Sequence, residues 1–313
     1  MPPTGHREAP KLVALIGATA SGKSAAALEL AGRYSAHVVN YDSVQLYRGL
    51  EIGAAKPTPE ERARFPHHLY DLGGPDEEIT AGAYAKAASA LIDDLLSQGG
   101  RIILVGGTGL YLRALCKGLS GAPPTEPAMR EALESRFAGT PTPAVHEALA
   151  KADPLAAERI GKNDRQRIFR ALAVFEQTGR PLSDWQASHG FREERYSPAL
   201  IGLAVKRETL YKRIGERSRS MLEAGLLEET RGLLEKGYPP EGAALSSIGY
   251  RQAVEHLSGR MPLEAVLGSL EQDTRRYAKR QLTWWRGETG IEWVPADDDV
   301  EAAVGAAGKA WGN

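Results

Sequence analysis

The sequence predicts an α/β protein with a parallel sheet, helices on both faces of that sheet, and an all-helical inserted domain. Two observations predict the sheet: short apolar runs alternate with helical patterns through the first 120 residues, and glycine or polar residues follow each run. A third observation predicts the insertion. A long stretch with helical patterning and no strand pattern separates the fourth apolar run from the next one.

The elements of the first half follow one another as strand and helix. Strands are predicted at residues 11–17, 37–42, 68–72 (the weakest pattern) and 101–105. Helices are predicted at residues 24–34 and 81–98, the second with Thr80 as its N-cap and Gly99 as its stop. The strand at 101–105 ends at a double glycine and leads into another helix.

The composition of the sequence changes after Gly118, where the segment GLSGAPPTEPAMR is rich in proline, glycine and small residues. A strand pattern returns only at residues 198–206. We therefore divide the chain into a core of residues 1–120 and 195–313 and a helical insertion of residues 121–194. From residue 207 onward we expect helices, with breaks at 237–240 and 258–262, and a frayed or loosely packed acidic tail after residue 295.

Composition narrows the class of protein. The 313-residue chain has 25% charged residues and one cysteine, Cys116, so an intramolecular disulfide is excluded and a reducing compartment is favoured. The opening MPPTGHREAP lacks the apolar run of a secretory signal, and no segment is long and apolar enough to span a bilayer. We expect a cytoplasmic monomer that does not associate with membranes.

The net charge of −1 hides two basic regions. Residues 159–219 carry 14 Lys and Arg against 7 Asp and Glu, and RRYAKRQLTWWR at residues 275–286 adds five bases and no acid. Basic residues interleaved with aromatics can contact nucleic acid. The same residues could also form an ordinary solvated helix surface, with the tryptophans in the core.

Residues 17–24, GATASGKS, match the phosphate-binding pattern G-x-x-x-x-G-K-[ST] between a predicted strand and a predicted helix. In such a loop the backbone N–H groups face phosphate oxygens, Lys23 neutralises charge and Ser24 can ligate Mg²⁺. We therefore predict a P-loop NTPase-like core that binds a diphosphate or triphosphate, with Mg²⁺ as cofactor and Ser24 as its protein ligand.

An acidic residue is expected near this loop, but the strand at 101–105 ends in glycines and threonine. The acid appears instead as Asp42, at the end of the strand at 37–42, followed by Ser43 and Gln45. Since the carboxyl ends of parallel strands face one crevice, Asp42 should lie across from the phosphate loop. It could act as a base or support magnesium from a distance, or it could simply cap a turn.

Seven blocks of sequence resemble the bacterial tRNA dimethylallyltransferases, also called tRNA isopentenyltransferases, and together they span nearly the whole chain. The blocks, in order, are GATASGKS, NYDSVQLYRGLEIGAAKP, PHHLYDL, LVGGTGLYLRAL, DPLAAERIGKNDRQRIFRALAVFEQTGRPLS, IGYRQ and KRQLTWWRG. The chain departs from the family pattern at Ala18, Ala54 and Gly161-Lys162, and none of these positions is assigned to chemistry. No Cys/His cluster has zinc-finger spacing, so the extended eukaryotic form is not expected.

The resemblance implies a reaction. The enzyme would move the dimethylallyl group of dimethylallyl diphosphate onto the exocyclic N6 amine of the adenosine 3′-adjacent to the anticodon in tRNA, releasing diphosphate. Asp42 would accept the amine proton, Thr19 and Lys23 would bind the donor phosphates, and Arg217 would help to anchor the diphosphate. The cradle for the donor diphosphate would comprise Gly17, Ala18, Thr19, Ala20, Ser21, Gly22, Lys23 and Ser24.

The resemblance also implies two groups of tRNA-binding residues, one in the core and one in the insertion. They are Asp42, Ser43, Val44, Gln45 and Thr108 in the core, and Arg130, Gln166, Arg167, Ile168, Phe169 and Arg170 in the insertion. Arg167 and Arg170 are three residues apart on a predicted helix, so both could face RNA phosphate. The alternative is a solvated basic face packed through its apolar side.

Three other functions share parts of this pattern. An ATP-dependent small-molecule kinase would have the same phosphate loop and core but would leave the basic regions without a role. An adenylate-type isopentenyltransferase would use the same donor without an RNA-sized basic surface. A nucleotide-gated RNA-binding regulator would hydrolyse ATP or GTP and transfer no prenyl group. His67 and His68 have no acidic or cysteine partner at ligand spacing, and we interpret them as structural.

Overall fold

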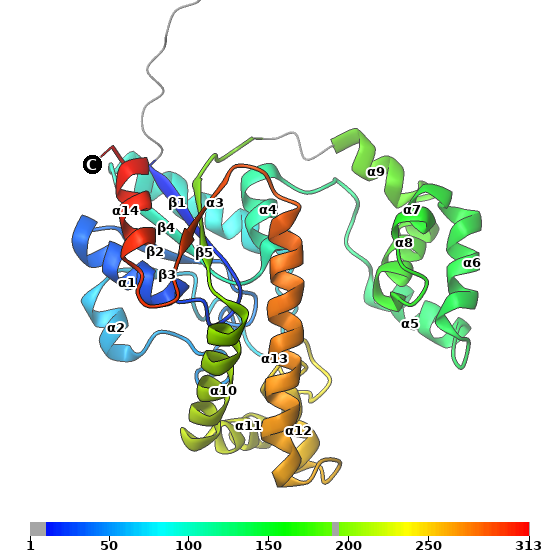
Figure 1. The fold of residues 1–313 in the computed structure, drawn as a ribbon. Coiled ribbons are helices and arrows are strands. Elements are labelled where there is room, and N and C mark those ends of the chain that lie inside the picture. Colours follow the sequence, from blue (N-terminus) through cyan, green and yellow to red (C-terminus); the bar gives the residue numbers. More distant parts are fainter. Residues whose placement is uncertain (1–10, 190–193, 313) are drawn as a thin grey trace, which may run out of the picture. The chain divides into compact units, whose positions relative to one another are not determined.

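The computed structural model describes residues 11–189 and 194–312. It comprises two compact units, coloured along the chain in Figure 1. The first unit contains the residues up to Cys116 and those from Tyr196 onward, and the second unit is Lys117–Arg195, which includes the predicted insertion. The described residues contain no helix that is both long and apolar enough to cross a membrane.

The first unit is built on a six-stranded sheet with the order β3-β2-β4-β1-β5-β6, and every pairing in it is parallel. The strands are β1 (Leu12–Ile16), β2 (His37–Asn40), β3 (His67–His68), β4 (Ile102–Val105), β5 (Ala199–Ala204) and β6 (Ile291–Pro295). The chain crosses from β1 to β2 and back to β4, so the carboxyl ends of these three central strands meet at one edge.

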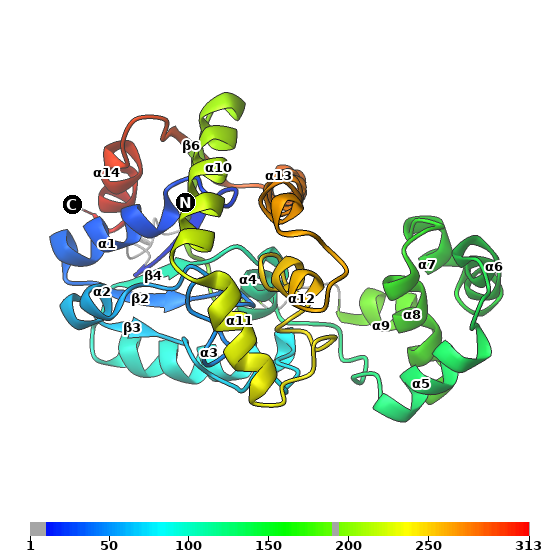
Figure 2. The same ribbon diagram turned by 90° about the horizontal axis from the view of Figure 1, so that it is seen from below.

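Helices cover both faces of this sheet, as predicted. Val13 and Leu15 of β1 pack on the side of α1 (Lys23–Tyr34) and α14 (Glu301–Ala310), whereas Ala14 and Ile16 pack on the side of α3 (Ala81–Ser97) and α4 (Gly109–Lys117). Figure 2 shows α1 and α14 on one side of the strands and α3 on the other. Because both faces are buried, β1 is apolar at every position rather than at alternate ones.

The remaining helices of this unit are α2 (Pro59–Arg64), α10 (Arg207–Glu223), α11 (Leu226–Glu235), α12 (Tyr250–Leu257) and α13 (Leu263–Arg286). Two of them, α10 and α13, pack against each other below the carboxyl edge of the sheet in Figure 1. Leu210 and Ile214 of α10 meet Ala278 of α13 and Ala18 of the phosphate loop in a small apolar cluster. This packing fixes both helices next to the loop.

The carboxyl-terminal segment differs from the prediction of helices followed by a loose tail. Residues 291–295 form β6, which pairs with β5 along the register from Leu200 opposite Ile291 to Ala204 opposite Pro295. The tail then forms α14, whose Ala303, Val304 and Ala307 are buried against the sheet. Its apolar residues are mainly alanines that follow an acidic run at residues 297–299, a pattern too weak to distinguish a packed helix from a solvated one.

The weak strand prediction at residues 68–72 is also wrong in its extent, because β3 contains only His67 and His68. The chain leaves the sheet immediately afterward, with positive φ at Leu69 (59°) and Asp71 (58°). This bend brings the Asp71 carboxylate to the buried ammonium of Lys56 and to Arg62. At this edge of the sheet, the ion pairs of Asp71 with Lys56 and Arg62 therefore take the place of further strand pairing.

The described part of the second unit, residues 117–189 and 194–195, contains five helices: α5 (Pro127–Arg136), α6 (Thr142–Ala152), α7 (Pro154–Arg159), α8 (Arg165–Thr178) and α9 (Leu182–His189). Leu133, Leu149 and Leu172 contribute to its own apolar core. Asp153 is fully buried there, and its two carboxylate oxygens accept the N–H groups of Ala156 and Ser183, both at 2.9 Å. One charged side chain therefore caps α7 and holds the start of α9.

Candidate active site

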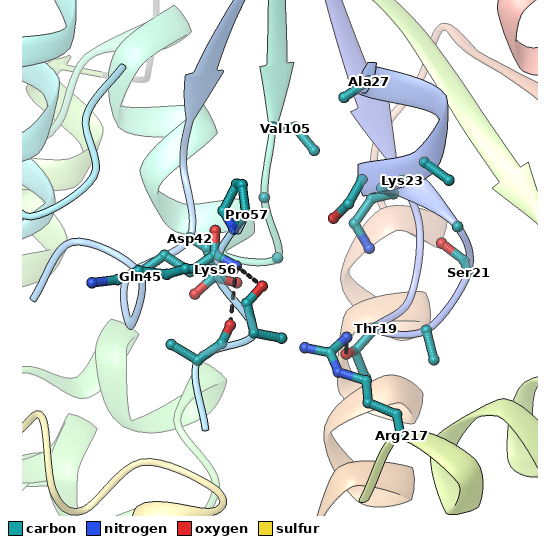
Figure 3. Close-up of a pocket in the computed structure, with 18 of the residues that line it drawn as sticks. Thr19, Ser21, Lys23, Ala27, Asp42, Gln45, Lys56, Pro57, Val105 and Arg217 are labelled. Carbon is teal, nitrogen blue, oxygen red and sulfur yellow. Dashed lines mark hydrogen bonds between the residues drawn. The ribbon is translucent and has the colours of Figure 1, made fainter. Parts of the chain in front are cut away.

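A pocket of about 480 Å³ lies at the carboxyl ends of β1, β2 and β4. Figure 3 shows its two walls. The phosphate loop with Lys23 forms one wall, together with Arg217 from α10, and Asp42 with Gln45 and Lys56 forms the other. The sequence-based expectation that Asp42 lies across from the loop therefore matches the arrangement of the pocket.

The phosphate loop turns sharply because two of its glycines adopt positive φ, 150° at Gly17 and 98° at Gly22. At Gly17 a side chain would lie 2.8 Å from Ser21 Oγ and 3.2 Å from the carbonyl oxygen of Leu203. Residues 19–24 of the predicted cradle line the pocket, whereas Gly17 and Ala18 are buried outside its lining. The amino-terminal end of α1, with its unpaired N–H groups, opens toward the same space.

Lys23 is held by the loop's own backbone. Its ammonium donates hydrogen bonds to the carbonyl oxygens of Gly17 (3.1 Å) and Ala18 (2.6 Å). Burial, followed by repulsion from Arg217, lowers the pKa of Lys23 to about 7, although attraction to Asp42 acts in the opposite direction. A buried ammonium with so low a pKa gains much from a bound anion, which is the property that a phosphate-binding lysine requires.

Arg217 projects from α10 toward the same loop, and its guanidinium donates to Thr19 Oγ1 at 3.4 Å. Burial lowers the pKa of Arg217, while Asp42 and Tyr277 favour its charged form. The structure thus brings together Thr19, Lys23 and Arg217, the three residues assigned to the donor phosphates. Arg213, one helical turn earlier, also lines the pocket but donates to the carbonyl oxygen of Ala296 at 3.1 Å.

Asp42 both closes a turn and faces the pocket, so the two interpretations offered for it are compatible. Its Oδ1 accepts the N–H of Val44 at 3.0 Å, and its own N–H donates to Asn40 Oδ1 at 2.8 Å. These bonds fix the side chain next to Gly107, where a Cβ atom would lie 2.8 Å from Asp42 Oδ2. Glycine at this position therefore makes room for the carboxylate.

The other predicted tRNA-binding residues of the core are all half-buried but differ in what they contact. Gln45 lines the pocket, and its amide nitrogen donates to the carbonyl oxygens of Ala54 and Ala55, both at 3.0 Å. Thr108 instead accepts the N–H of Ser43 at 3.0 Å and donates to the Ser43 hydroxyl at 3.0 Å. Val44 packs against the main apolar core.

Sequence reasoning missed several pocket residues, and two of them, Tyr277 and Gln281, lie on α13. The Gln281 side chain accepts the N–H of Thr19 at 2.7 Å and donates to the carbonyl oxygen of Gly107 at 2.8 Å. The Tyr277 hydroxyl donates to the same carbonyl oxygen at 3.2 Å. Their spacing of four residues, on the face of α13 that carries buried Trp285, could have indicated a polar pair turned inward.

In the helical unit, the predicted tRNA-binding residues do not share one environment. Arg130, Gln166 and Arg167 are exposed, and Arg170 is half-buried and donates to Thr125 Oγ1 at 2.9 Å. Ile168 lies in the apolar core of the unit with no exposed surface. A side-chain contact between Ile168 and RNA is thus incompatible with this fold, and helix packing explains the residue at that position.

The residues around the loop fit a magnesium ion held chiefly by its ligand's phosphates. Ser24, in the first turn of α1, is exposed and lines the pocket. Among the described residues no group of three or more His, Cys, Asp or Glu side chains could hold a metal ion. One hydroxyl next to a phosphate cradle is a donor set typical of Mg²⁺, which keeps most of its other ligands as water and phosphate oxygens.

The fold and the pocket define the class of protein: an α/β enzyme with a phosphate loop after its first strand and a carboxylate facing that loop. The chain belongs to the IPP transferase family, whose model matches residues 45–288. It is 49% identical to the tRNA dimethylallyltransferase of Geobacter metallireducens over 92% of this chain and 94% of that one. The corresponding protein of Geobacter sulfurreducens is 47% identical over 94% and 95% of the two chains.

Solved structures show the same relationship. The full-length tRNA isopentenylpyrophosphate transferase of Bacillus halodurans superposes with a TM-score of 0.69 at 34% identity, covering 96% of this chain and 97% of that one. Crystallographic snapshots of a eukaryotic dimethylallyltransferase acting on tRNA give a TM-score of 0.75 at 27% identity, covering 92% and 74%. The resemblance drawn from the seven sequence blocks is confirmed, and the protein is a transferase.

Proposed function

We propose that this enzyme transfers the dimethylallyl group of dimethylallyl diphosphate to the N6 amine of the adenosine 3′-adjacent to the anticodon in tRNA. The observation that carries the proposal is the pairing of two opposed walls in one pocket, with Lys23 and Arg217 on one and Asp42 on the other. Two relatives named tRNA dimethylallyltransferase, at 49% and 47% identity, support the same reaction.

The chemistry assigns a separate task to each wall. The allylic C–O bond breaks and its electron pair leaves with the diphosphate, while the adenosine N6 forms a bond to the same carbon and loses a proton. Lys23, Arg217 and the Thr19 hydroxyl stabilise the charge that develops on the diphosphate oxygens. Asp42 takes the proton from N6, whose acidity rises as the new bond forms, so the position of the carboxylate relative to N6 is what the reaction requires.

Magnesium completes the donor site in this proposal. Ser24 would be its protein ligand, and the ion would neutralise part of the charge on the diphosphate. The remaining stabilisation comes from the chain itself, through the N–H groups of residues 20–24 and the two basic side chains.

We also propose that the enzyme is cytoplasmic and acts as a monomer. Light scattering would test the oligomeric state, and we expect it to give the mass of one chain.

The tRNA is bound by surfaces outside the pocket as well as by Gln45 inside it. Arg130, Gln166 and Arg167 are exposed on the helical unit and fit contacts with RNA phosphate and sugar. The adenosine must leave its stack to reach Asp42, so the enzyme captures a base from the anticodon loop rather than one from a helix.

A direct assay tests this function against its rivals. Purified enzyme with Mg²⁺, dimethylallyl diphosphate and an unmodified tRNA bearing adenosine 3′ of its anticodon should yield a nucleoside heavier by one dimethylallyl group. The same tRNA with guanosine at that position is the matched control. Transfer to free adenine nucleotides but not to tRNA would indicate the adenylate-type enzyme. ATP hydrolysis or phosphoryl transfer without prenylation would indicate a kinase or a nucleotide-gated regulator.

The two arginines of α8 should respond differently to alanine substitution. Arg167→Ala removes an arginine whose side chain is 70% exposed, so tRNA affinity should fall and the slope of log K against log salt should decrease by about 1. Arg170→Ala breaks the bond to Thr125 and should mainly lower the Tm. Filter binding at several salt concentrations and thermal unfolding measure the two effects. An unchanged salt slope for Arg167→Ala would count against phosphate contact.

A further inference from the structure

Gln281 is a buried amide between two loops of the active site. Its side chain lies on α13, the residue is 5% exposed, and both ends of its amide are bonded to backbone. The N–H of Thr19 can only donate and the carbonyl oxygen of Gly107 can only accept, so a single orientation of the amide satisfies both. A glutamate side chain has the same length but offers only acceptors when it is ionised.

The two backbone groups belong to opposite sides of the reaction. Thr19 is part of the loop proposed to hold the donor diphosphate. Gly107 lies against the Asp42 carboxylate, and the next residue, Thr108, accepts the N–H of Ser43 at 3.0 Å. Gln281 therefore joins the wall that holds the leaving group to the wall that holds the proton acceptor.

We propose that Gln281 is a positioning residue that fixes the separation between the phosphate loop and Asp42. This inference rests on the proposed transfer reaction. Bond making and bond breaking occur on one carbon between the two walls, so a shift of about 1 Å in either wall can cost on the order of a hundredfold in rate. Tyr277 supports one end of this link, because its hydroxyl donates to the carbonyl oxygen of Gly107. None of the described hydrogen bonds joins Tyr277 to the phosphate loop.

Gln281→Leu keeps most of the volume and leaves the Thr19 N–H without its partner. We expect kcat to fall by about a hundredfold, the Kd of inorganic diphosphate to rise above that of the control below but by less than about tenfold, and the KM for tRNA to stay within about twofold. Gln272→Leu is the matched control, since it makes the same change at an exposed position of α13. A side chain that served stability alone would lower Tm without this separation of kcat from KM.

Gln281→Glu gives a readout that does not depend on the amount of folded protein. The carboxylate can still accept the Thr19 N–H, but it cannot donate to Gly107 and it adds a negative charge near Asp42. The acidic limb of the pH–rate profile should move to higher pH by about one unit, because two close carboxylates resist ionisation together. The titratable groups that interact electrostatically with Asp42 include Lys23, Tyr41, Tyr70, Tyr111, Arg217 and Tyr277.

Two results would overturn the inference: a kcat for Gln281→Leu within threefold of that for Gln272→Leu, or an acidic limb for Gln281→Glu that coincides with the wild-type limb. Failure of the proposed function is a separate outcome, seen when the wild-type enzyme transfers no prenyl group. In that case the Kd of inorganic diphosphate tests the proposed role of Gln281. Equal Kd values for Gln281→Leu and Gln272→Leu would show that Gln281 does not position the loop.

Discussion

Asp42→Asn should lower kcat by about 10³-fold, the middle of the range for loss of a general base. The carboxamide oxygen can still accept the Val44 N–H, so the turn that holds this side chain is retained. What is lost is the ability to take the proton from N6. Single-turnover transfer to tRNA, followed by mass analysis of the nucleosides, measures the effect without a contribution from product release.

Unlike kcat, the affinities for diphosphate and tRNA should not fall in the Asp42→Asn variant. Inorganic diphosphate should bind at least as tightly, because a negative charge that faces Lys23 and Arg217 has been removed. Affinity for tRNA should change little. Asp298→Asn makes the same change at an exposed position after β6 and serves as the control. A kcat within tenfold of wild type would exclude Asp42 as the base, as would a loss confined to tRNA binding.

Lys23→Met should nearly abolish transfer and yet stabilise the protein. Removing one preorganised donor to a developing anion costs about 10²-fold to 10³-fold in rate. Lys23 also lowers the free energy of unfolding, because burial disfavours its charged form and lowers its pKa from 10.5 to about 7. The unfolded chain therefore binds more protons than the folded one between pH 7 and 10.5, and wild-type stability rises with pH across that window.

It follows that the Tm advantage of Lys23→Met over wild type should be largest below pH 7, about 2 °C or more, and should shrink as the pH rises above 7. The KM for the donor should rise with pH above 7 in the wild type, as Lys23 loses its proton, and not in the variant. Lys86→Met, at an exposed position of α3, is the control. A variant less stable than wild type at pH 6 would contradict this account.

Local features of this fold were predictable from sequence because they depend on neighbouring residues. The phosphate loop combines an apolar strand, two glycines and a lysine within a short segment, and each residue acts on the backbone next to it. Asp42 could be placed because the carboxyl ends of parallel strands meet at one edge, whatever the rest of the chain does. The role of Arg217 was different, since it came only from the family resemblance and not from any local pattern.

What the sequence did not reveal depends on contacts between distant segments. Gln281 bonds to Thr19, which is 262 positions earlier in the chain, and no periodicity reports such a contact. Among the described strands β6 lies at the edge of the sheet next to β5, and none of its five residues is buried, so it lacks the buried apolar run that made β1 recognisable. Ile168 was assigned to RNA from the family resemblance, but the packing of α8 determines its environment.

The order of the segments also has a consequence for how the enzyme matures during translation. The nascent chain presents its phosphate loop early, whereas Arg217, Gln281 and the sheet partners β5 and β6 are synthesised only after the helical insertion. Domains generally form as their segments emerge. A ribosome-bound intermediate would thus display an incomplete anion cradle, and prenylation competence would arise only once the distal third of the polypeptide had been made.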